Sequence, residues 1–300
     1  MAVWSGLGIT VNIPHIFWYN YEASIGEPII KELVSLKITK IRVTFVTYGS
    51  DTSRTAMRLY CSQIREALPN AYVIFGTTCS PGATKISASN WDAYASQVVE
   101  DAEYAEANGL CDEFVIGNEM ENDYNNDGTL SAQEIRDNMK LLATAVSAVY
   151  SGVVSYNVAQ GQEDGWVTDG KGTLDKLGFN IYGTNGTFGT FKDYVVEIHD
   201  AFGDDCYISE WSGSHPTWSS TSLNGITETS IGFDDAYAVE NKNRLDFIRA
   251  TGLLSAYFFT HTWYEPTARN GFAMRMFEGG YRKTMDVLLE RRVTHKFWGN

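Results

Sequence analysis

The stretch EFVIGNEMENDYNNDGTLSAQE, residues 113–134, decides how the rest of the chain is interpreted. It begins as a short apolar run, Phe114–Ile116, and an amide and a carboxylate, Asn118 and Glu119, follow where a strand should end. Acidic and amide side chains then alternate until a helical pattern begins. One segment therefore offers a candidate catalytic acid and, directly beside it, a candidate calcium loop.

Strand-like and helix-like segments alternate on both sides of this stretch, from one end of the chain to the other. Runs rich in apolar, β-branched and aromatic residues predict strands at residues 7–13, 40–48, 71–77, 113–117, 153–158, 177–182, 206–209 and 255–263. Apolar residues at helical spacing predict helices at residues 27–36, 53–68, 90–109, 131–150, 191–202, 234–251 and 280–291, with a short turn within 161–176. Asn90 is placed to cap its helix, and residues 212–232 are expected to form a loop.

The order of these segments predicts an α/β fold, a (β/α)8 TIM barrel formed as a single domain by residues 1–300. Eight strand–helix units in about 290 residues match this barrel in count and length. Its strands are buried on both faces, which accounts for their nearly continuous apolar character. A doubly wound open sheet is the competing architecture. It would carry a glycine-rich phosphate turn after the first strand, and residues 7–10, LGIT, lack that pattern.

The composition allows a sizeable core, because 44% of the 300 residues are hydrophobic and 20% are charged. The formal net charge of -14 argues against nucleic acid or an anionic membrane as a partner, and it suits neutral substrates. No run approaches the ~20 apolar residues of a membrane span, and we find no signal-peptide pattern. We expect a monomer that acts outside the cell as a mature domain, with action in the cytoplasm as the open alternative.

The cysteines show no CxxC motif and no metal-like spacing. Buried thiols are therefore expected, with one disulfide as the alternative. The residues concerned are Cys61, Cys79, Cys111 and Cys206.

In a parallel barrel the functional side chains stand at the carboxyl ends of the strands. Two glutamates stand there, Glu119 after the fourth predicted strand and Glu210 at the end of the seventh. Acid/base sugar chemistry needs a neutral carboxyl that protonates the leaving oxygen and an ionised carboxylate that attacks or stabilises the oxocarbenium-like centre. Indole rings also stack on the apolar C–H face of a pyranose. The other polar or aromatic residues at these strand ends are Arg42, Asn118, Asn157, Asn180, Tyr182, Trp211, His261 and Trp263.

In these positions the chain resembles the clan A glycoside hydrolases, retaining enzymes built on a (β/α)8 barrel. The resemblance covers the whole barrel in order, and it implies that Glu119 in VIGNE is the acid/base and Glu210 in YISEW the nucleophile. It also implies that the surrounding side chains bind or support the substrate. These are Asn118 at the sugar 2-hydroxyl, Arg42 and Tyr182 beside the nucleophile, and Trp263 under the sugar. We add Asn180 and Trp211 as substrate-binding residues, although Trp211 is equally able to cover a loop.

The sequence departs from the family 5 members of this clan at two points. His-x-Tyr on the sixth strand is replaced by Asn180-x-Tyr182, and the proline that often follows the acid is replaced by Met120. The family and the sugar therefore stay open. We expect endo action on a plant or microbial polysaccharide such as a β-glucan or mannan, with no organic cofactor.

Residues 123–134 match every position of an EF-hand calcium loop. Oxygen ligands fill the alternating positions, Gly128 permits the sharp turn, and a glutamate closes the loop. The entering helix is replaced by the fourth strand, so the pattern predicts a structural Ca2+ that braces the loop after Glu119. An unliganded acidic turn before a capped helix is the alternative. The expected ligands are Asp123, Asn125, Asp127, Thr129, Ser131 and Glu134.

Three other classes of protein compete with a retaining glycosidase. A catalytically silent carbohydrate-binding barrel would bind oligosaccharides without turnover, and the presence of both glutamates weighs against it. A calcium-regulated binding protein would need a second calcium hand, and no second pattern occurs. A metal-dependent barrel hydrolase would need a His-x-His pair on the first strand, and residues 7–13 contain none.

Overall fold

The computed structural model describes most of the chain between residues 38 and 212 and shorter segments on either side. The described residues are 6–12, 30–31, 33–35, 38–43, 45–79, 84–182, 188–212, 222–223, 226–227, 233–253, 256–264 and 273–275. None of the helices within them is long and apolar enough to cross a membrane.

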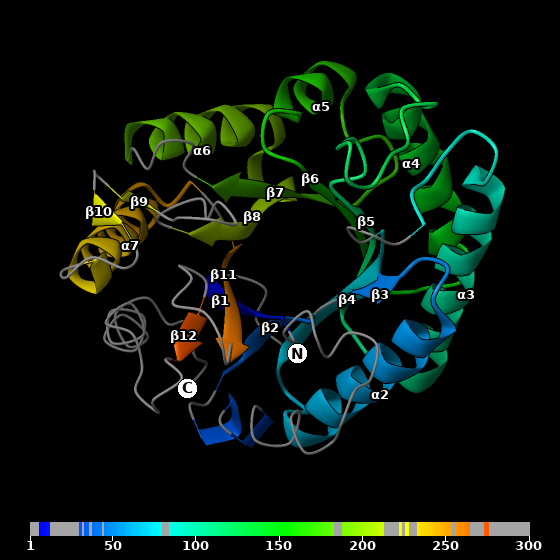
Figure 1. Cartoon of the computed structure of the whole chain (residues 1–300), viewed down its shortest axis with the longest axis horizontal. Helices are drawn as coiled ribbons and strands as arrows, with labels where there is room; N and C mark the ends of the chain where they lie inside the picture. Colours follow the sequence, from blue (N-terminus) through cyan, green and yellow to red (C-terminus); the bar gives the residue numbers. More distant parts are fainter. Residues whose placement is uncertain are drawn as a thin grey trace.

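Parallel strands form a curled sheet in which β1 pairs with both β2 and β11 (Figure 1). The order around the sheet is β1-β2-β4-β5-β6-β7-β8-β11, with every neighbouring pair parallel. The carboxyl ends of these strands therefore share one edge of the sheet. The strands are β1 Gly6–Asn12, β2 Lys40–Val43, β4 Tyr72–Thr78, β5 Glu113–Asn118, β6 Val153–Val158, β7 Lys176–Tyr182, β8 Cys206–Ser212 and β11 Ala256–Tyr264.

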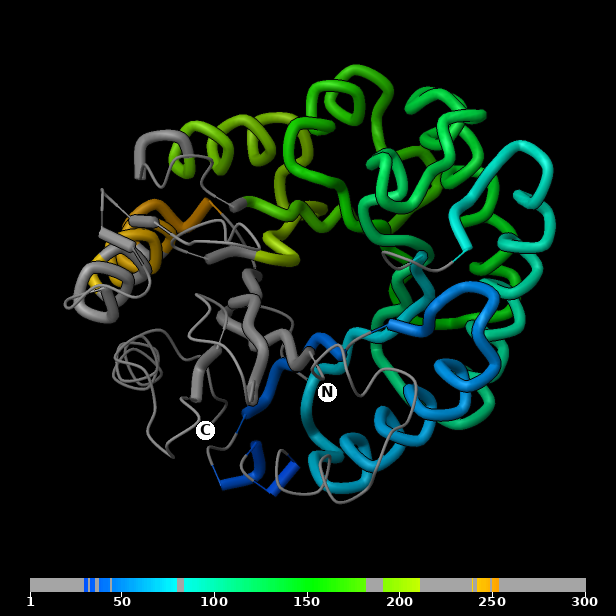
Figure 2. The backbone as a smooth tube through the Cα atoms, in the orientation of Figure 1, coloured from blue at the N-terminus to red at the C-terminus, as the bar shows by residue number. Residues whose placement is uncertain are grey.

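Helices connect the strands and surround the sheet on its outer face (Figures 1 and 2). Local signals fix where two of them begin. The Ser50 hydroxyl accepts the Ser53 N–H at the start of α2, and Ser131 and Glu134 form a reciprocal capping box at the start of α4. The helices are α2 Asp51–Ala67, α3 Trp91–Asn108, α4 Ala132–Ser147, α5 Glu163–Asp169, α6 Phe188–Phe202 and α7 Phe233–Thr251, with a 3-10 turn η3 at Gly203–Asp205.

Strand residues alternate between two buried environments. On β5, Phe114 and Ile116 join the large core beneath the helices, whereas Val115 belongs to a small cluster that also contains Ile74 of β4 and Tyr207 of β8. Because successive side chains on a strand point to opposite faces, this small cluster fills the inner face of the curled sheet. Burial on both faces explains why these strands are nearly continuously apolar.

Where the structure describes them, the sequence-based segments agree with it in order and, within a few residues, in extent, except that the short turn expected within 161–176 is the helix α5. One predicted strand is wrong as a single unit, since residues 40–48 form β2 and a short β3, Val46–Thr47. The predicted loop at 212–232 contains two short paired strands, β9 Ser222–Leu223 and β10 Ile226–Thr227, and β12 Ala273–Arg275 was not predicted. The predicted final helix, residues 280–291, lies outside the described residues.

Two smaller expectations have clear outcomes. Asn90 precedes α3, but its side chain makes no capping bond and instead accepts the Ser87 N–H at 2.8 Å. All four cysteines are free thiols, as expected, and three of them are buried.

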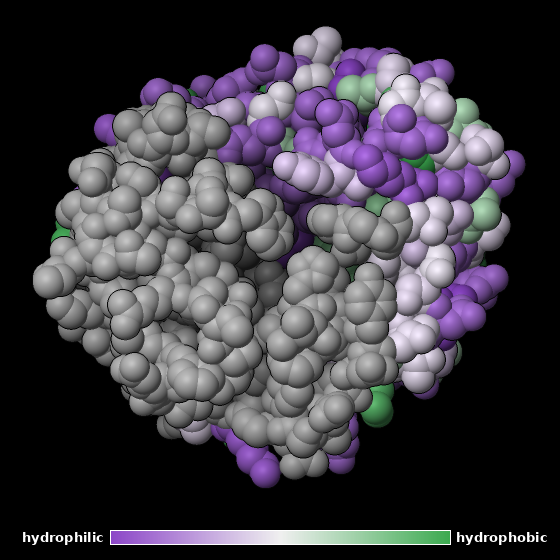
Figure 3. Space-filling view, viewed as in Figure 1, coloured by the Kyte–Doolittle hydropathy of each residue, from purple (hydrophilic) through white to green (hydrophobic). Residues whose placement is uncertain are grey.

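The described part of the face over α4 and α5 is mainly hydrophilic, in keeping with the acidic composition (Figure 3).

Candidate active site

The predicted site residues that the structure describes lie on one edge of the sheet. Asn118 is the last residue of β5, Asn180 lies near the end of β7, and Glu210 near the end of β8. Asn180 and Glu210 are paired in register. The guanidinium of Arg42 on β2 contacts both Asn118 and Glu210. Strands that are far apart in the sequence therefore bring the two glutamates into one site.

Glu119 follows β5 in a conformation that a side-chain-bearing residue rarely adopts. Its φ is 55°, the one positive value among the non-glycine residues that the structure describes. Such left-handed backbone costs roughly 1–2 kcal/mol. The Glu119 N–H donates to the Asn157 carbonyl at 2.8 Å, and its own carbonyl accepts the Asn122 N–H at 3.1 Å. These bonds hold the strained turn that carries the carboxylate beyond the strand end.

The Glu119 carboxyl is held by two amides. Asn180 Nδ2 donates to Oε1 at 2.8 Å, and Asn122 Nδ2 donates to Oε2 at 3.3 Å. Burial raises the pKa of Glu119 to about 7, and the negative charge of Glu210 adds to this effect. The Asn180 hydrogen bond and the Arg42 charge oppose the increase in pKa. Near neutral pH this carboxyl can therefore both donate and accept a proton.

The Glu210 carboxyl lies in a different environment, beside a buried guanidinium. Arg42 Nη2 is 2.7 Å from Glu210 Oε1, and the two side chains are only 4% and 14% exposed. The guanidinium also lies over the Phe45 ring, 4.5 Å from its centroid. A cation at this distance favours a negatively charged partner. The two glutamates thus differ in what surrounds them, one held by neutral amides and the other by a cation.

The Asn118 amide oxygen connects these two halves of the site. It accepts hydrogen bonds from Arg42 Nη2 at 2.9 Å, Asn157 Nδ2 at 3.2 Å and Asn180 Nδ2 at 3.3 Å. Because all three donors approach the oxygen, the orientation of the Asn118 amide is determined. Its Nδ2 is the end that can donate to a sugar hydroxyl.

Irregularities in strand pairing decide which side chains reach the site. The register between β7 and β8 shifts between Phe179 and Asn180, so that the side chains of both Ser209 and Glu210 lie at the site. Ser209 Oγ donates to Asn180 Oδ1 at 2.7 Å, which directs the Asn180 nitrogen toward Glu119. A comparable shift lies between β5 and β6, just before Asn118. Such bulges re-aim side chains, and the sequence pattern gave no signal for either of them.

A second buried carboxylate lies two residues beyond Glu119. Glu121 accepts the Trp166 Nε1–H at 2.7 Å and the Tyr156 hydroxyl, and the same hydroxyl accepts the Met120 N–H at 2.8 Å. Burial raises the pKa of Glu121. These contacts anchor the chain just after the strained turn. The sequence pattern did not identify Glu121, because a second glutamate two residues after Glu119 carries no signal of its own.

Three predicted substrate-binding residues belong to described strands, but their side chains lie outside the described part of the structure. Tyr182 is the last residue of β7, and Trp211 and Trp263 belong to β8 and β11. Trp211 is paired in register with Ile181 and Phe259. The strand positions place these residues at the same sheet edge as Glu210, and their roles in binding stay predictions.

The predicted calcium loop is closed by hydrogen bonds within the protein. Asp127 Oδ1 accepts from the Thr129 N–H and hydroxyl, and Glu134 Oε2 accepts from the Ser131 N–H and hydroxyl. Asn125 is buried, and its Nδ2 donates to the carbonyls of Asn118 and Glu119 at 3.1 and 2.9 Å.

The donor set for a metal in this loop is mixed. The Asn125 Oδ1 atom is buried and has no hydrogen-bond partner, as expected of an oxygen that awaits a ligand. Lys85 Nζ bonds to the Asp123 carbonyl, which places a competing cation at the first position of the loop. Within the described part of the chain, no three His, Cys, Asp or Glu side chains are grouped so that they could hold a metal ion.

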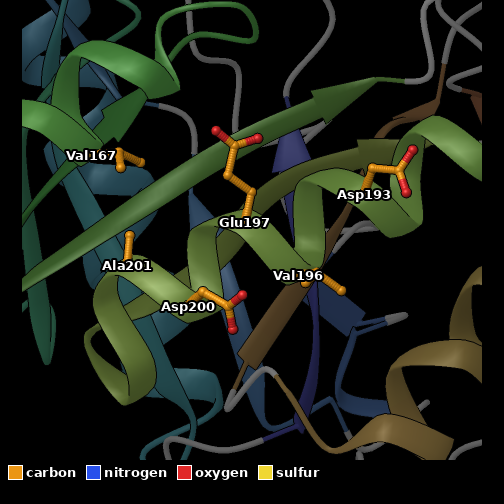
Figure 4. A pocket seen from close by; sticks show the side chains of 6 residues that line it. All are labelled: Val167, Asp193, Val196, Glu197, Asp200 and Ala201. Carbon is orange, nitrogen blue, oxygen red and sulfur yellow. The ribbon is translucent and has the colours of Figure 1, made fainter.

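A separate groove lies on the outer surface between α5 and α6 (Figure 4). Its lining carries three acidic side chains of α6, Asp193, Glu197 and Asp200, beside Val167 of α5. Burial and a hydrogen bond with Asp164 raise the pKa of Glu197. The groove is lined by outer helices and not by strand ends, so it is distinct from the site around Glu119 and Glu210.

No protein-family model matches the chain, and no curated protein matches it. Solved structures do resemble it. One is a GH113 β-1,4-mannanase, with a TM-score of 0.68, 14% identity and coverage of 97% of this chain and 100% of that one. Another is an exo-β-1,4-mannosidase from an Opitutaceae bacterium, with a TM-score of 0.71, 11% identity and coverage of 97% and 60%.

A GH5_18 enzyme from Bifidobacterium longum subsp. longum, solved in complex with Manβ1-4GlcNAc, has a TM-score of 0.68 and 12% identity, with coverage of 97% of this chain and 78% of that one. At these identities the likeness establishes the fold and not the activity. The α/β class and its curled parallel sheet are confirmed, and the structures that share them are glycoside hydrolases of the kind that the sequence resembles.

Proposed function

We propose that this protein is a retaining β-glycoside hydrolase in which Glu119 is the acid/base and Glu210 the nucleophile. The observation that carries the proposal is the pairing of two carboxyls in unlike environments. The pKa of Glu119 is raised to about 7 by burial and by Glu210, whereas Glu210 is ion-paired with Arg42 at 2.7 Å. Carboxyl pairs whose environments differ in this way divide the acid and nucleophile roles between them.

The reaction proceeds by double displacement. Glu210 attacks the anomeric carbon and forms a glycosyl ester, while Glu119 transfers its proton to the departing glycosidic oxygen. Glu119, now ionised, takes a proton from water, and that water attacks the anomeric carbon and releases Glu210. Asn118 and Arg42 hold the sugar and the nucleophile in place between the two steps. The mechanism requires the two carboxyl groups to be about 5 Å apart, and about 8 Å would indicate inversion.

The proposed substrate is a neutral β-linked polysaccharide such as a mannan or β-glucan, cleaved within the chain. The acidic net charge of -14 suits a neutral polymer, and one of the similar structures is a β-1,4-mannanase. Another of the similar structures is an exo-acting mannosidase. The lengths of the oligosaccharides released from the polymer therefore distinguish endo from exo action. We further propose a complete (β/α)8 barrel within residues 1–300, secreted and monomeric, with Tyr182, Trp211 and Trp263 around the sugar.

We also propose one structural Ca2+ in the loop 123–134. The orphaned oxygen of Asn125 supports it, and Asn125 holds the carbonyls of Asn118 and Glu119 through its nitrogen. Bound calcium would thereby brace the turn that carries the acid/base without taking part in the chemistry.

A panel of β-glycans tested with wild-type protein, Glu210→Ala and Glu119→Ala examines the catalytic proposal. We expect one substrate class to be cleaved by the wild type, with both variants losing at least about 100-fold in kcat/KM. Proton NMR of the first product should show the β-anomer, and azide should restore turnover of Glu210→Ala on an activated glycoside with an α-glycosyl azide as product. Binding of oligosaccharides without any turnover would instead support the carbohydrate-binding alternative. An α-anomer as first product would contradict retention.

A further inference from the structure

A buried carboxyl lies at the opposite end of β5 from the site. Glu113, the first residue of β5, is fully buried on the inner face of the sheet. Three hydroxyls converge on it: Ser155 Oγ at 2.5 Å and Tyr207 OH at 2.6 Å on Oε1, and Tyr72 OH at 3.1 Å on Oε2. Burial of a carboxyl is costly unless it is fully hydrogen-bonded, so this arrangement needs a reason beyond packing.

The Tyr207 hydroxyl links this carboxyl to the site. It lies 2.6 Å from Glu113 Oε1 and 3.2 Å from Asn157 Oδ1. Asn157 in turn donates from Nδ2 to Asn118 Oδ1 at 3.2 Å. A continuous column of hydrogen bonds therefore runs along the inner face, from the amino end of β5 to the amide that contacts both Arg42 and Asn180.

The protons of this column can be placed consistently. The Tyr207 hydroxyl has one proton and faces two acceptors, Glu113 Oε1 and Asn157 Oδ1, so it holds both oxygens at its own position on the inner face. Burial raises the pKa of Glu113, and the hydrogen bonds from Ser155, Tyr207 and Tyr72 oppose this increase. The Asn157 amide then presents its oxygen to Tyr207 and its nitrogen to Asn118. With the opposite orientation, two amide oxygens would face each other.

The chain also keeps space for the Asn157 amide. Gly178 is paired in register with Asn157 on one side and with Tyr207 on the other. A Cβ at position 178 would lie 2.4 Å from Asn157 Oδ1 and 2.8 Å from Ser209 Oγ, closer than real contacts allow. A glycine is therefore required where the column passes.

We propose that Glu113 and Tyr207 are positioning residues for catalysis, which fix the Asn157 amide so that it orients Asn118 toward the substrate. The inference rests on the proposed glycosidase function and extends it to the far end of the sheet. The column acts through Asn118, whose oxygen is shared by the groups that hold Glu119 and Glu210. A loosened Asn118 displaces a sugar contact and both carboxyl supports together.

The test compares Tyr207→Phe with Tyr72→Phe. Each variant removes one buried hydroxyl from the Glu113 carboxyl, but only Tyr207 contacts Asn157. We expect Tyr207→Phe to lower kcat by about 10-fold or more with a smaller change in KM, and Tyr72→Phe to stay within about 2-fold of wild type. Glu113→Gln, which keeps an acceptor oxygen for Tyr207, should retain more activity than Glu113→Ala. Equal losses in the two tyrosine variants would overturn the proposal.

A second measurement does not depend on turnover. Hydrogen exchange of the Asn157 side-chain amide, followed by NMR, should be at least about 10-fold faster in Tyr207→Phe than in Tyr72→Phe or wild type. Unchanged exchange in Tyr207→Phe would overturn the positioning role. If wild type cleaves no glycan, the proposed function fails, and the exchange measurement still decides whether the column orients Asn157.

Discussion

Glu119 and Glu210 are the same residue type made different by their neighbours. Glu119 sits on a strained turn among amides, and Glu210 lies against a buried guanidinium. The sequence predicted both glutamates because each follows or ends a recognisable strand. It also predicted Arg42, Asn118 and Asn180. The sequence did not identify Ser209 and Glu121, because a serine beside Glu210 and a carboxylate two residues beyond Glu119 have no pattern that distinguishes them from surface residues.

The first prediction concerns the pH dependence of the reaction. In the proposed reaction the first chemical step needs protonated Glu119, whose pKa is raised to about 7. We expect kcat/KM to fall as the pH rises through 7, tenfold for each further pH unit once Glu119 is ionised. The Arg42→Lys variant tests the same assignment. Arg42 lowers the pKa of Glu119, and lysine lacks the planar group that reaches both Glu210 and Asn118, so the alkaline limb of kcat/KM should lie at higher pH in this variant. A profile without an alkaline limb near neutral pH would contradict the assignment of Glu119.

At the scale of elements, the strand ends carry more information than the strands themselves. Runs of apolar, β-branched and aromatic residues predicted the extent of β5, β6 and β7 closely, since both faces of these strands are buried. The register shifts before Asn118 and Asn180 were not predictable, because they depend on pairing between strands and not on the composition of either strand. The column of hydrogen bonds through Tyr207 was not predictable either, because it also depends on which strands are neighbours.

The second prediction concerns the contact between α2, α3 and β4. Asp101 of α3 is buried and accepts from Arg54 Nε at 3.1 Å, Arg58 Nη2 at 2.5 Å and Thr77 Oγ1 at 2.8 Å. Asp101→Asn removes the charge and leaves two arginines without their shared partner. We expect a loss of about 2–4 kcal/mol in the free energy of unfolding, measured with urea.

Asp51→Asn is the matched control for this change. Asp51 also faces Arg54, but at 3.9 Å and with a fully exposed side chain, so the urea midpoint should not move. Similar midpoints for the Asp101 and Asp51 variants would show that the buried charge contributes no more than the exposed one.

The third prediction concerns the loop 123–134. If Ca2+ binds the native loop, a concentration 100 times the dissociation constant stabilises the fold by about 2.7 kcal/mol, and a chelator removes this. We expect a higher melting temperature in calcium than in chelator for wild type, and no difference for Asp127→Ala. If the melting temperature of the wild type is the same with calcium and with chelator, residues 123–134 form an unliganded acidic turn closed by Thr129 and Ser131.

At the scale of the molecule, the order of strands and helices was predictable and the closure of the sheet was not visible in any single segment. β1 and β11 pair along seven successive residues, although most of the chain separates them. Local patterns report whether a strand is buried, but they do not report its partner. The count of strand–helix units supplied the missing step, because it matched an architecture in which the first and last strands must meet.

The fourth prediction concerns the pH dependence of stability of the whole protein. Glu113, Glu119 and Glu121 have pKa values raised by burial, so each stabilises the fold most below its unfolded pKa and loses that contribution as the pH rises through its folded pKa. For Glu119, whose folded pKa is about 7, the loss amounts to at most roughly 3 kcal/mol. The carboxyls with lowered pKa act in the opposite direction, but they lie on the surface and are screened by solvent.

The net charge of -14 adds repulsion in the same sense, since it grows as carboxyls ionise. We therefore expect the melting temperature to be highest at about pH 5 and to decline toward pH 8. Glu119→Gln removes one of the titrating groups, so its melting temperature should decline less steeply than that of wild type over the same interval. A melting temperature that rises between these pH values would mean that the buried carboxyls are ionised in the folded protein without cost, and it would remove the basis for assigning Glu119 as a proton donor near neutral pH.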